Sequence, residues 1–238
     1  MERSPRRAET KRVRLKVAQH NCRGSNDAFI TLFHIVKNFD ISFVCVQDPP
    51  RYKGDPLRAP RYECMFQKTE NVRVCTYISL RVLLEISFVI FACIENVLYL
   101  RIFTKEEKLV GQSKSAGIVN AYNRRTKEGN SVQAESLFRE TNKPTIIVRD
   151  LNVHTSLTDP MRVLSSLERR NGEMYMRTAA LSGYTILNTP GIYTRFPDKV
   201  MIYRPSIIDY SLANAAMFNK ISRRRDITQR TSWIISLL

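Results

Sequence analysis

Three polar residues stand at every second position in the stretch "VRDLNVH", residues 148–154. They are Asp150, Asn152 and His154, and an apolar run, "PTIIV", leads directly into them. Side chains of an extended segment alternate between its two sides, so we expect all three on one face. Core packing alone does not require three polar side chains on one face at the end of a buried strand. The spacing therefore indicates a chemical site.

Several other apolar segments also end in polar or acidic residues. Strand carboxyl ends are where open α/β sheets gather their ligands. Carboxylates from two strands can hold a hard cation such as Mg²⁺, which polarises a phosphoryl oxygen, while Asn and Tyr can donate hydrogen bonds to phosphate. A single Asp or Asn at a strand end also fits a simple turn, so the argument depends on the whole set. The set is Asn21, Gln47, Asp48, Tyr122, Asp150, Asn152 and Asp209.

Strands and helices alternate along the chain in an order that can carry these residues. Ser25 is placed to cap a helix with one apolar face. Apolar runs predict strands at 15–22, 41–47, 72–80, 86–93, 96–103, 116–122, 145–148, 184–188 and 206–213. Helices are predicted at 131–140, 160–169 and 173–182. No repeat or linker is visible, which predicts one layered α/β sandwich domain over residues 15–238.

The chain is strongly basic, with 38 Lys and Arg against 22 Asp and Glu and a formal charge of +16. Such a surplus favours a polyanionic partner: nucleic acid, an anionic membrane or phosphorylated small molecules. The first 16 residues hold seven basic and two acidic residues and lack the apolar stretch of a secretory signal. We expect residues 1–14 to form a disordered basic arm that binds phosphates, serves as a nuclear address or has no role.

Membrane insertion and disulfide bonding are not predicted. The longest apolar region, residues 82–103, is interrupted by three charged residues and is interpreted as two core strands. The cysteines are odd in number and mostly flanked by apolar residues, with no CxxC pair, so we expect free thiols in a reducing compartment. These features predict an intracellular, nuclear protein. The cysteines are Cys22, Cys45, Cys64, Cys75 and Cys93.

The order of six segments resembles the endonuclease/exonuclease/phosphatase superfamily, which has a DNase I-like fold. The segments are "QHNCRG", "VCVQDPP", "IVNAYN", "IIVRDLNVH", "LNTPGIYTRFP" and "RPSIIDYSLAN". They are most similar to the apurinic-type endonuclease domain of non-LTR retrotransposons, over residues 15–214. The resemblance implies two packed mixed β-sheets flanked by helices. It also implies cleavage of DNA with one or two Mg²⁺ or Mn²⁺ ions.

The resemblance assigns metal and phosphate binding to three positions. Asn21 matches an Asn that contacts phosphate or metal. Asp48 matches the acidic metal ligand, which is usually the longer Glu in the family. Tyr122 matches the Tyr that helps to orient the phosphate.

Four further positions match catalytic residues of the family. Asp150 matches the Asp that positions or activates the attacking water, and Asn152 matches the Asn that steadies the transition state and also contacts the phosphate. Asp209 matches the Asp that orients a catalytic His. His154 matches a His that retrotransposon versions often place two residues after the Asn.

The sequence departs from the family's pattern in three places. The family's final "SDH" supplies a metal-binding Asp and an acid/base His, but no His follows His154 and the only acidic residue beyond Asp209 is Asp226. We therefore expect an incomplete last core strand. Arg149 replaces a Gly and is expected to set a long cation beside the metal site. Asp48 is shorter than Glu by one methylene, about 1.5 Å, where metal ligands tolerate only tenths of an ångström.

Three hypotheses follow. The first is a metal-dependent phosphodiesterase acting on DNA, derived from a retrotransposon and impaired by the missing acid/base group, a loss that typically costs about 10²–10⁴ in rate. The second is a nucleic-acid-binding remnant without catalysis. The third is a phosphatase of the same superfamily, acting on inositol phosphates or phospholipid headgroups.

Overall fold

A computed structural model describes most of the chain. The described residues are 15–94, 96–104, 115–123, 125–126, 129–130, 137–138, 142–160, 162–194, 207–228 and 232–237. The arm predicted for residues 1–14 and most of the helix predicted for 131–140 lie outside these ranges.

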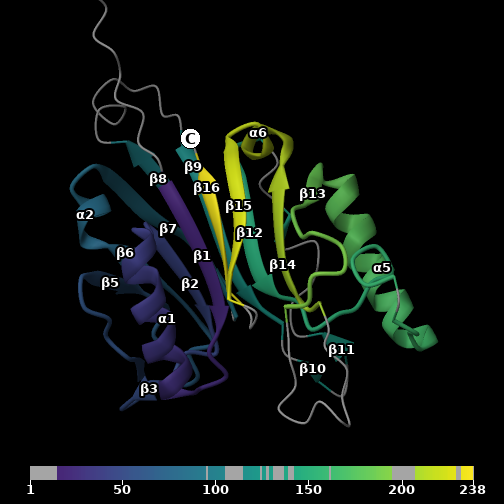
Figure 1. The fold of residues 1–238 in the computed structure, drawn as a ribbon, viewed down its shortest axis with the longest axis horizontal. Helices are drawn as coiled ribbons and strands as arrows, with labels where there is room; N and C mark the ends of the chain where they lie inside the picture. The colour runs from purple at the N-terminus through teal and green to yellow at the C-terminus, as the bar shows by residue number, and fades with distance from the viewer. Residues whose placement is uncertain are drawn as a thin grey trace, which may run out of the picture.

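Two mixed β-sheets of six strands each form the centre of the fold (Figure 1). The first sheet has the order β15-β16-β1-β2-β6-β5, and the second has the order β13-β14-β12-β9-β8-β7. The strands of the first sheet are β1 (Leu15–Asn21), β2 (Phe43–Gln47), β5 (Tyr62–Met65), β6 (Val74–Ser79), β15 (Ile221–Thr228) and β16 (Ser232–Leu237). Those of the second are β7 (Ile86–Ile94), β8 (Val97–Thr104), β9 (Ser115–Tyr122), β12 (Thr145–Asp150), β13 (Tyr184–Ile186) and β14 (Asp209–Asn214). Two short hairpins pair β3 (Arg51–Tyr52) with β4 (Asp55–Pro56), and β10 (Arg125–Thr126) with β11 (Gly129–Asn130).

A helix covers the outer face of each sheet, on opposite sides of the molecule (Figure 1). α1 (Asn26–Phe39) buries Phe29, Leu32 and Val36 against the first sheet, and the Ser25 hydroxyl caps it by accepting the amide of Ala28. α5 (Ser166–Leu181) packs Tyr175, Met176 and Ala179 against the second sheet. Two single-turn helices, α2 (Leu80–Leu83) and α6 (Ala215–Phe218), complete the described helices. The predicted α/β sandwich is confirmed, and it has four layers.

Strand alternation decides which side chains of β12 face the space between the sheets. Ile146 and Val148 belong to the core between the two sheets, whereas Ile147 belongs to the core under α5. By the same alternation Asp150 follows the inner set, and Arg149 follows the outer set. A residue at the end of β12 can therefore reach across to the first sheet.

Two predicted elements differ from the structure. Residues 160–169 and 173–182 were each expected to be helical, but one helix, α5, begins at Ser166 because Ser165 and Glu168 form a capping box there. The last strand was expected to be incomplete, yet β16 pairs antiparallel with β1 from Leu15↔Leu237 to Gln19↔Trp233. The strand is thus formed even though the sequence lacks the family's "SDH" in front of it.

The cysteines whose side chains are described carry free thiols, as expected. Cys22, Cys45, Cys64 and Cys75 are free, and the side chain of Cys93 lies outside the described set. Burial raises the pKa of Cys45 to about 12, which is typical of an inert core thiol. None of the helices in the described part has the length and hydropathy of a membrane span.

Asn120 of β9 links the two sheets inside the core. Its side-chain nitrogen donates to the carbonyl of Cys75 at 2.8 Å, and its oxygen accepts the Gln47 amide at 2.6 Å. We expect Asn120→Ala to lower the free energy of unfolding by about 3 kcal/mol, because the buried Gln47 amide loses its acceptor. Urea unfolding measures the change. Asn71→Ala, at an exposed position, should stay within about 0.5 kcal/mol of wild type, and equal losses in the two variants would contradict the role of Asn120.

Candidate phosphate site at the strand ends

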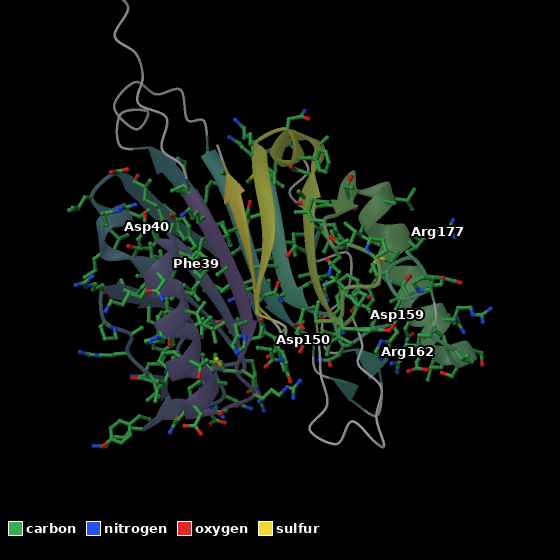
Figure 2. All side chains as sticks on the ribbon, viewed as in Figure 1. Phe39, Asp40, Asp150, Asp159, Arg162 and Arg177 are labelled. Atoms are coloured by element: carbon green, nitrogen blue, oxygen red, sulfur yellow. The ribbon has the colours of Figure 1, made fainter. Side chains whose placement is uncertain are left out.

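The carboxylate of Asp150 joins the two sheets. Asp150 ends β12, is 1% exposed, and accepts a hydrogen bond from the side-chain nitrogen of Asn21, the last residue of β1, at 2.5 Å. A second link runs from Gln19 Nε2 to Asp209 Oδ1 at 3.5 Å. Figure 2 shows Asp150 between the two halves of the sandwich. Two of the predicted site residues, Asn21 and Asp150, are therefore in direct contact.

Tyr122, Asp150 and Asp209 form a row across the second sheet. Asp150 is in register with Tyr122 on the parallel neighbour β9 and with Asp209 on the antiparallel neighbour β14. Asp150 and Asp209 are buried, whereas Tyr122 is partly exposed. This strand pairing brings together residues that lie up to 87 positions apart in the sequence.

Asn152 is held in a turn directly after β12. Its φ of 50° lies in the left-handed region, which Asn adopts more readily than most residues. Its backbone amide donates to Asp150 Oδ1 at 3.0 Å, and its side-chain nitrogen donates to the carbonyl of Asn123 at 2.7 Å. Asn123 in turn donates to the carbonyl of Leu151 at 2.6 Å. Both oxygens of Asp150 are thus engaged, one by Asn21 and one by Asn152.

The extended chain predicted over residues 150–154 ends at Asp150, so the expected alternation does not continue to His154. The His154 imidazole is buried, with Nε2 4.0 Å from Glu168 Oε1 in the first turn of α5. Burial raises the pKa of Glu168, but hydrogen bonds from Ser165 and the nearby His154 and Arg162 outweigh it, so the pKa is lowered. The His154 side chain therefore lies against the first turn of α5.

Arg149 does not lie beside the metal-binding candidates, contrary to the expectation from sequence. It is fully buried on the outer face of β12, with its guanidinium carbon 5.0 Å from the centre of the Tyr175 ring. Burial lowers its pKa to about 10, while Tyr175 and Asp150 favour the charged form. The cation is therefore kept under α5, because neighbouring residues on a strand face opposite ways.

The Asp48 carboxylate is paired with an arginine. Asp48 follows β2 with a φ of 43°, and its Oδ1 lies 2.6 Å from Arg73 Nη1. Its backbone amide donates to the Arg73 carbonyl at 2.7 Å, and its own carbonyl accepts the amide of Gly24 at 2.8 Å. The preceding residue, Gln47, is in register with Asn21 on β1. Asp48 therefore belongs to the same edge of the first sheet as Asn21.

The oxygen atoms at this edge are of the kind that bind a hard cation. Mg²⁺ is coordinated by carboxylate and amide oxygens and completes its shell with water and substrate phosphate. Within the described ranges, however, no three His, Cys, Asp or Glu side chains gather as a metal cage. Asp48 already pairs with Arg73, and the side-chain oxygen of Asn21 accepts the amide of Arg23 at 2.9 Å. Any metal must therefore compete with these partners.

Arg73 and Gln19 were not predicted as site residues. Gln19 is a buried polar residue inside an apolar strand, and this pattern could have identified it as a candidate site residue. Arg73 gives no local signal, because its contact with Asp48 depends on the pairing of β2 with β6.

The fold is DNase I-like and is shared with several solved nucleases. The endonuclease domain of TRAS1, a telomere-specific non-LTR retrotransposon, is 14% identical with a TM-score of 0.71, over 94% of this chain and 98% of that chain. The AP endonuclease LMAP from Leishmania major is 12% identical with a TM-score of 0.65, over 94% and 87% of the two chains. The 3′–5′ exonuclease NExo from Neisseria meningitidis is 12% identical with a TM-score of 0.63, over 93% and 98%. No family model and no curated protein matches the sequence.

Proposed function

We propose that this chain binds the phosphate backbone of DNA at the edge where β1 and β12 end, and that it hydrolyses a phosphodiester bond there with the help of a divalent cation. The observation that carries the proposal is the Asn21–Asp150 contact, which joins a phosphate-binding type of residue to a buried carboxylate across the two sheets. A formal charge of +16 supports a polyanionic substrate. DNA is also the product bound in a structure of the similar protein NExo.

This proposal gives every site residue a role, and Asn21 and Asn152 have more than one. Asp150, held by Asn21 and Asn152, orients the attacking water, while Asn21, Asn152 and Tyr122 hold the phosphate oxygens. Asp48 and Asn21 are the candidate metal ligands, and a bound divalent ion would supply polarisation of the phosphoryl oxygen. Proton transfer is the weak point of this site. With the terminal His missing, Asp209 is the remaining candidate in register with Asp150, whereas the His154 imidazole lies beside Glu168, so slow turnover is expected.

Supercoiled plasmid is the substrate that tests the proposal. Purified protein with Mg²⁺ should convert it slowly to the nicked form, and the same protein in EDTA should not. DNA that is bound but never nicked would contradict the hydrolysis and leave the second candidate function.

The second candidate function is DNA binding without catalysis. Two observations favour it: Arg73 pairs with Asp48, and no histidine follows His154. Both candidates place the protein on DNA and so favour a nuclear site of action. They differ only in whether product appears.

DNA affinity should fall steeply with salt, because phosphate contacts release counterions. Each neutralised phosphate contributes a slope of about −0.9 to a plot of log affinity against log salt. We expect a slope near −4, the equivalent of about four contacts, from fluorescence anisotropy of a labelled duplex between about 50 and about 200 mM KCl. A second duplex of scrambled sequence is the control and should give the same slope. A flat plot would contradict backbone recognition.

A further inference from the structure

We propose that the Arg73 guanidinium is the resident cation of the Asp48 site. It occupies the carboxylate that a divalent ion would need, and it presents its remaining N–H groups to a DNA phosphate, so that phosphate binding does not require a metal. This inference rests on the proposed function, because it assigns the phosphate to the same edge of the sandwich.

The contact between Arg73 and Asp48 is short and partly buried. The ion pair measures 2.6 Å, and both side chains are 20% exposed. The backbones of the two residues are also hydrogen-bonded, at 2.7 Å. A second pair of the same length, Arg81–Asp40, is 64% and 57% exposed. Solvent screens an exposed pair far more than a partly buried one, so the Arg73 pair is the more persistent of the two.

Arg73 lies close to the phosphate-binding candidates. It immediately precedes β6, which pairs with β2, and β2 pairs with β1 in the same sheet. Cys22, the residue after Asn21, donates its backbone amide to the carbonyl of Gln47 at 2.9 Å, and the amide of Gly24 donates to the carbonyl of Asp48 at 2.8 Å. Asp48, with Arg73 bound to its carboxylate, therefore lies beside the segment that follows β1.

The chemistry of arginine suits this role. A guanidinium carries five N–H donors and no acceptor, and the 2.6 Å contact with Asp48 uses one of its nitrogens, Nη1. Arginine binds phosphate through paired N–H donors and keeps its charge at any physiological pH. A divalent ion binds carboxylate oxygens at roughly 2.0–2.6 Å, so an ion on Oδ1 of Asp48 would compete with Nη1 of Arg73. The positive charge of Arg73 also weakens the attraction of Asp48 for a metal.

Metal binding without DNA is the first test. The loss of the free Mn²⁺ signal in electron paramagnetic resonance gives the Mn²⁺ affinity of wild type, Arg73→Gln and the matched control Arg81→Gln, which removes the same charge from an exposed ion pair. We expect Arg73→Gln to bind Mn²⁺ about 10-fold more tightly than wild type, and Arg81→Gln to match wild type. Equal or weaker Mn²⁺ binding by Arg73→Gln would overturn the proposal.

DNA affinity in EDTA is the second test. Wild type should retain a labelled duplex in EDTA as well as in Mg²⁺ at equal ionic strength. Arg73→Gln should lose about 10-fold more affinity than Arg81→Gln, and Arg73→Lys should recover only part of the loss, because a lysine cannot make paired contacts. Loss of wild-type binding in EDTA, or equal losses in the two Gln variants, would overturn the proposal.

These readouts are independent of turnover. If no variant nicks DNA, the hydrolysis proposed above fails while the Mn²⁺ and affinity results still decide the role of Arg73. Arg73→Lys keeps the positive charge, so it separates a folding defect of Arg73→Gln from loss of the phosphate contact.

Discussion

Replacing Asp150 by asparagine should lower plasmid nicking by about 10²–10⁴-fold, the usual cost of losing a group that activates water. The carboxylate is buried at the junction of the two sheets and is held by Asn21 and by the amide of Asn152. Asparagine keeps its size and one accepting oxygen but lacks the negative charge that orients the attacking water. Initial rates of nicking in Mg²⁺ measure the change.

The matched control for this prediction is Asp27→Asn, which makes the same chemical change at an exposed position in the first turn of α1. It should nick at the wild-type rate. Equal nicking by wild type and Asp150→Asn would remove Asp150 from the chemistry and leave its contact with Asn21 as a structural link only.

Gly172→Ala should destabilise the fold by more than about 3 kcal/mol, beyond the usual cost of an overpacked core. Gly172 lies in the middle of α5, where a Cβ would stand 2.0 Å from the carbonyl oxygen of His154. That neighbour is backbone, so no side-chain rotation can relieve the clash. The segment 151–155 would have to move, and Asn152 with it. Urea unfolding gives the energy, and DNA affinity reports the displaced site.

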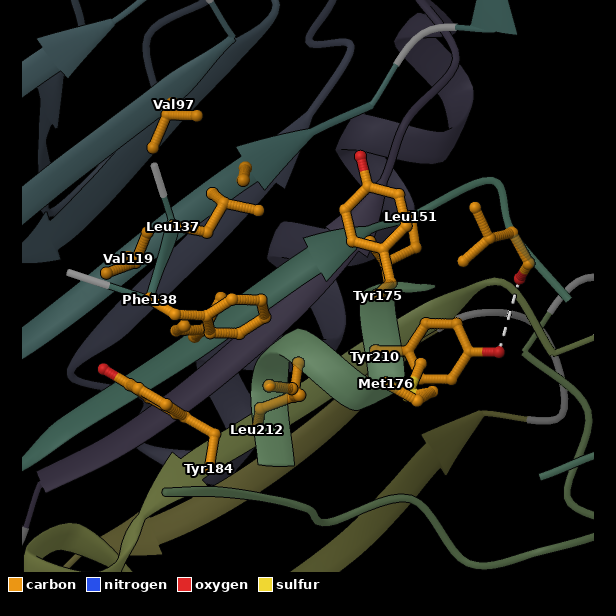
Figure 3. Packing of buried hydrophobic residues seen from close by; sticks show 14 of the residues in the cluster. Val97, Val119, Leu137, Phe138, Leu151, Tyr175, Met176, Tyr184, Tyr210 and Leu212 are labelled. Atoms are coloured by element: carbon orange, nitrogen blue, oxygen red, sulfur yellow. Dashed lines mark hydrogen bonds between the residues drawn. The ribbon is translucent and has the colours of Figure 1, made fainter. Parts of the chain in front are cut away.

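Packing around that segment leaves little room for such a movement. Tyr175 and Met176 of α5 and Tyr210 of β14 lie in one buried cluster with Leu151 (Figure 3). The Tyr210 hydroxyl donates to the carbonyl of Val153 at 3.3 Å. Glu173→Ala, at the next and exposed position, is the control and should change stability by no more than about 0.5 kcal/mol. A wild-type unfolding midpoint for Gly172→Ala would contradict the close approach of α5 to residue 154.

Local patterns in the sequence were sufficient to predict a layered α/β sandwich. Apolar runs marked most strands of the two sheets but not β5 or β15, and Ser25 marked the start of α1. The start of α5 was missed although its signal was present, since Ser165 and Glu168 form a capping box. Arg149 was expected beside the metal site because it precedes Asp150, whereas the alternation of β12 turns its side chain to the opposite face of the sheet.

Other parts of the candidate site could not be predicted in this way. The Gln19–Asp209 contact joins residues 190 positions apart, and Arg73 meets Asp48 across 25 positions. Both contacts follow from which strands pair and in what register. A single sequence does not encode that pairing locally, because many registers bury apolar residues equally well.

Side-chain amide NMR signals test the central claim most directly, because Asn21 and Asn152 are proposed to hold the DNA phosphate. A short duplex titrated into ¹⁵N-labelled protein in EDTA should shift the side-chain signals of Asn21 and Asn152 and the backbone amide of Asp48. The side-chain signal of Asn214, at the other end of β14 from Asp209, should not move. Unchanged signals from Asn21 and Asn152 under saturating DNA, with shifts confined to other parts of the chain, would contradict the account.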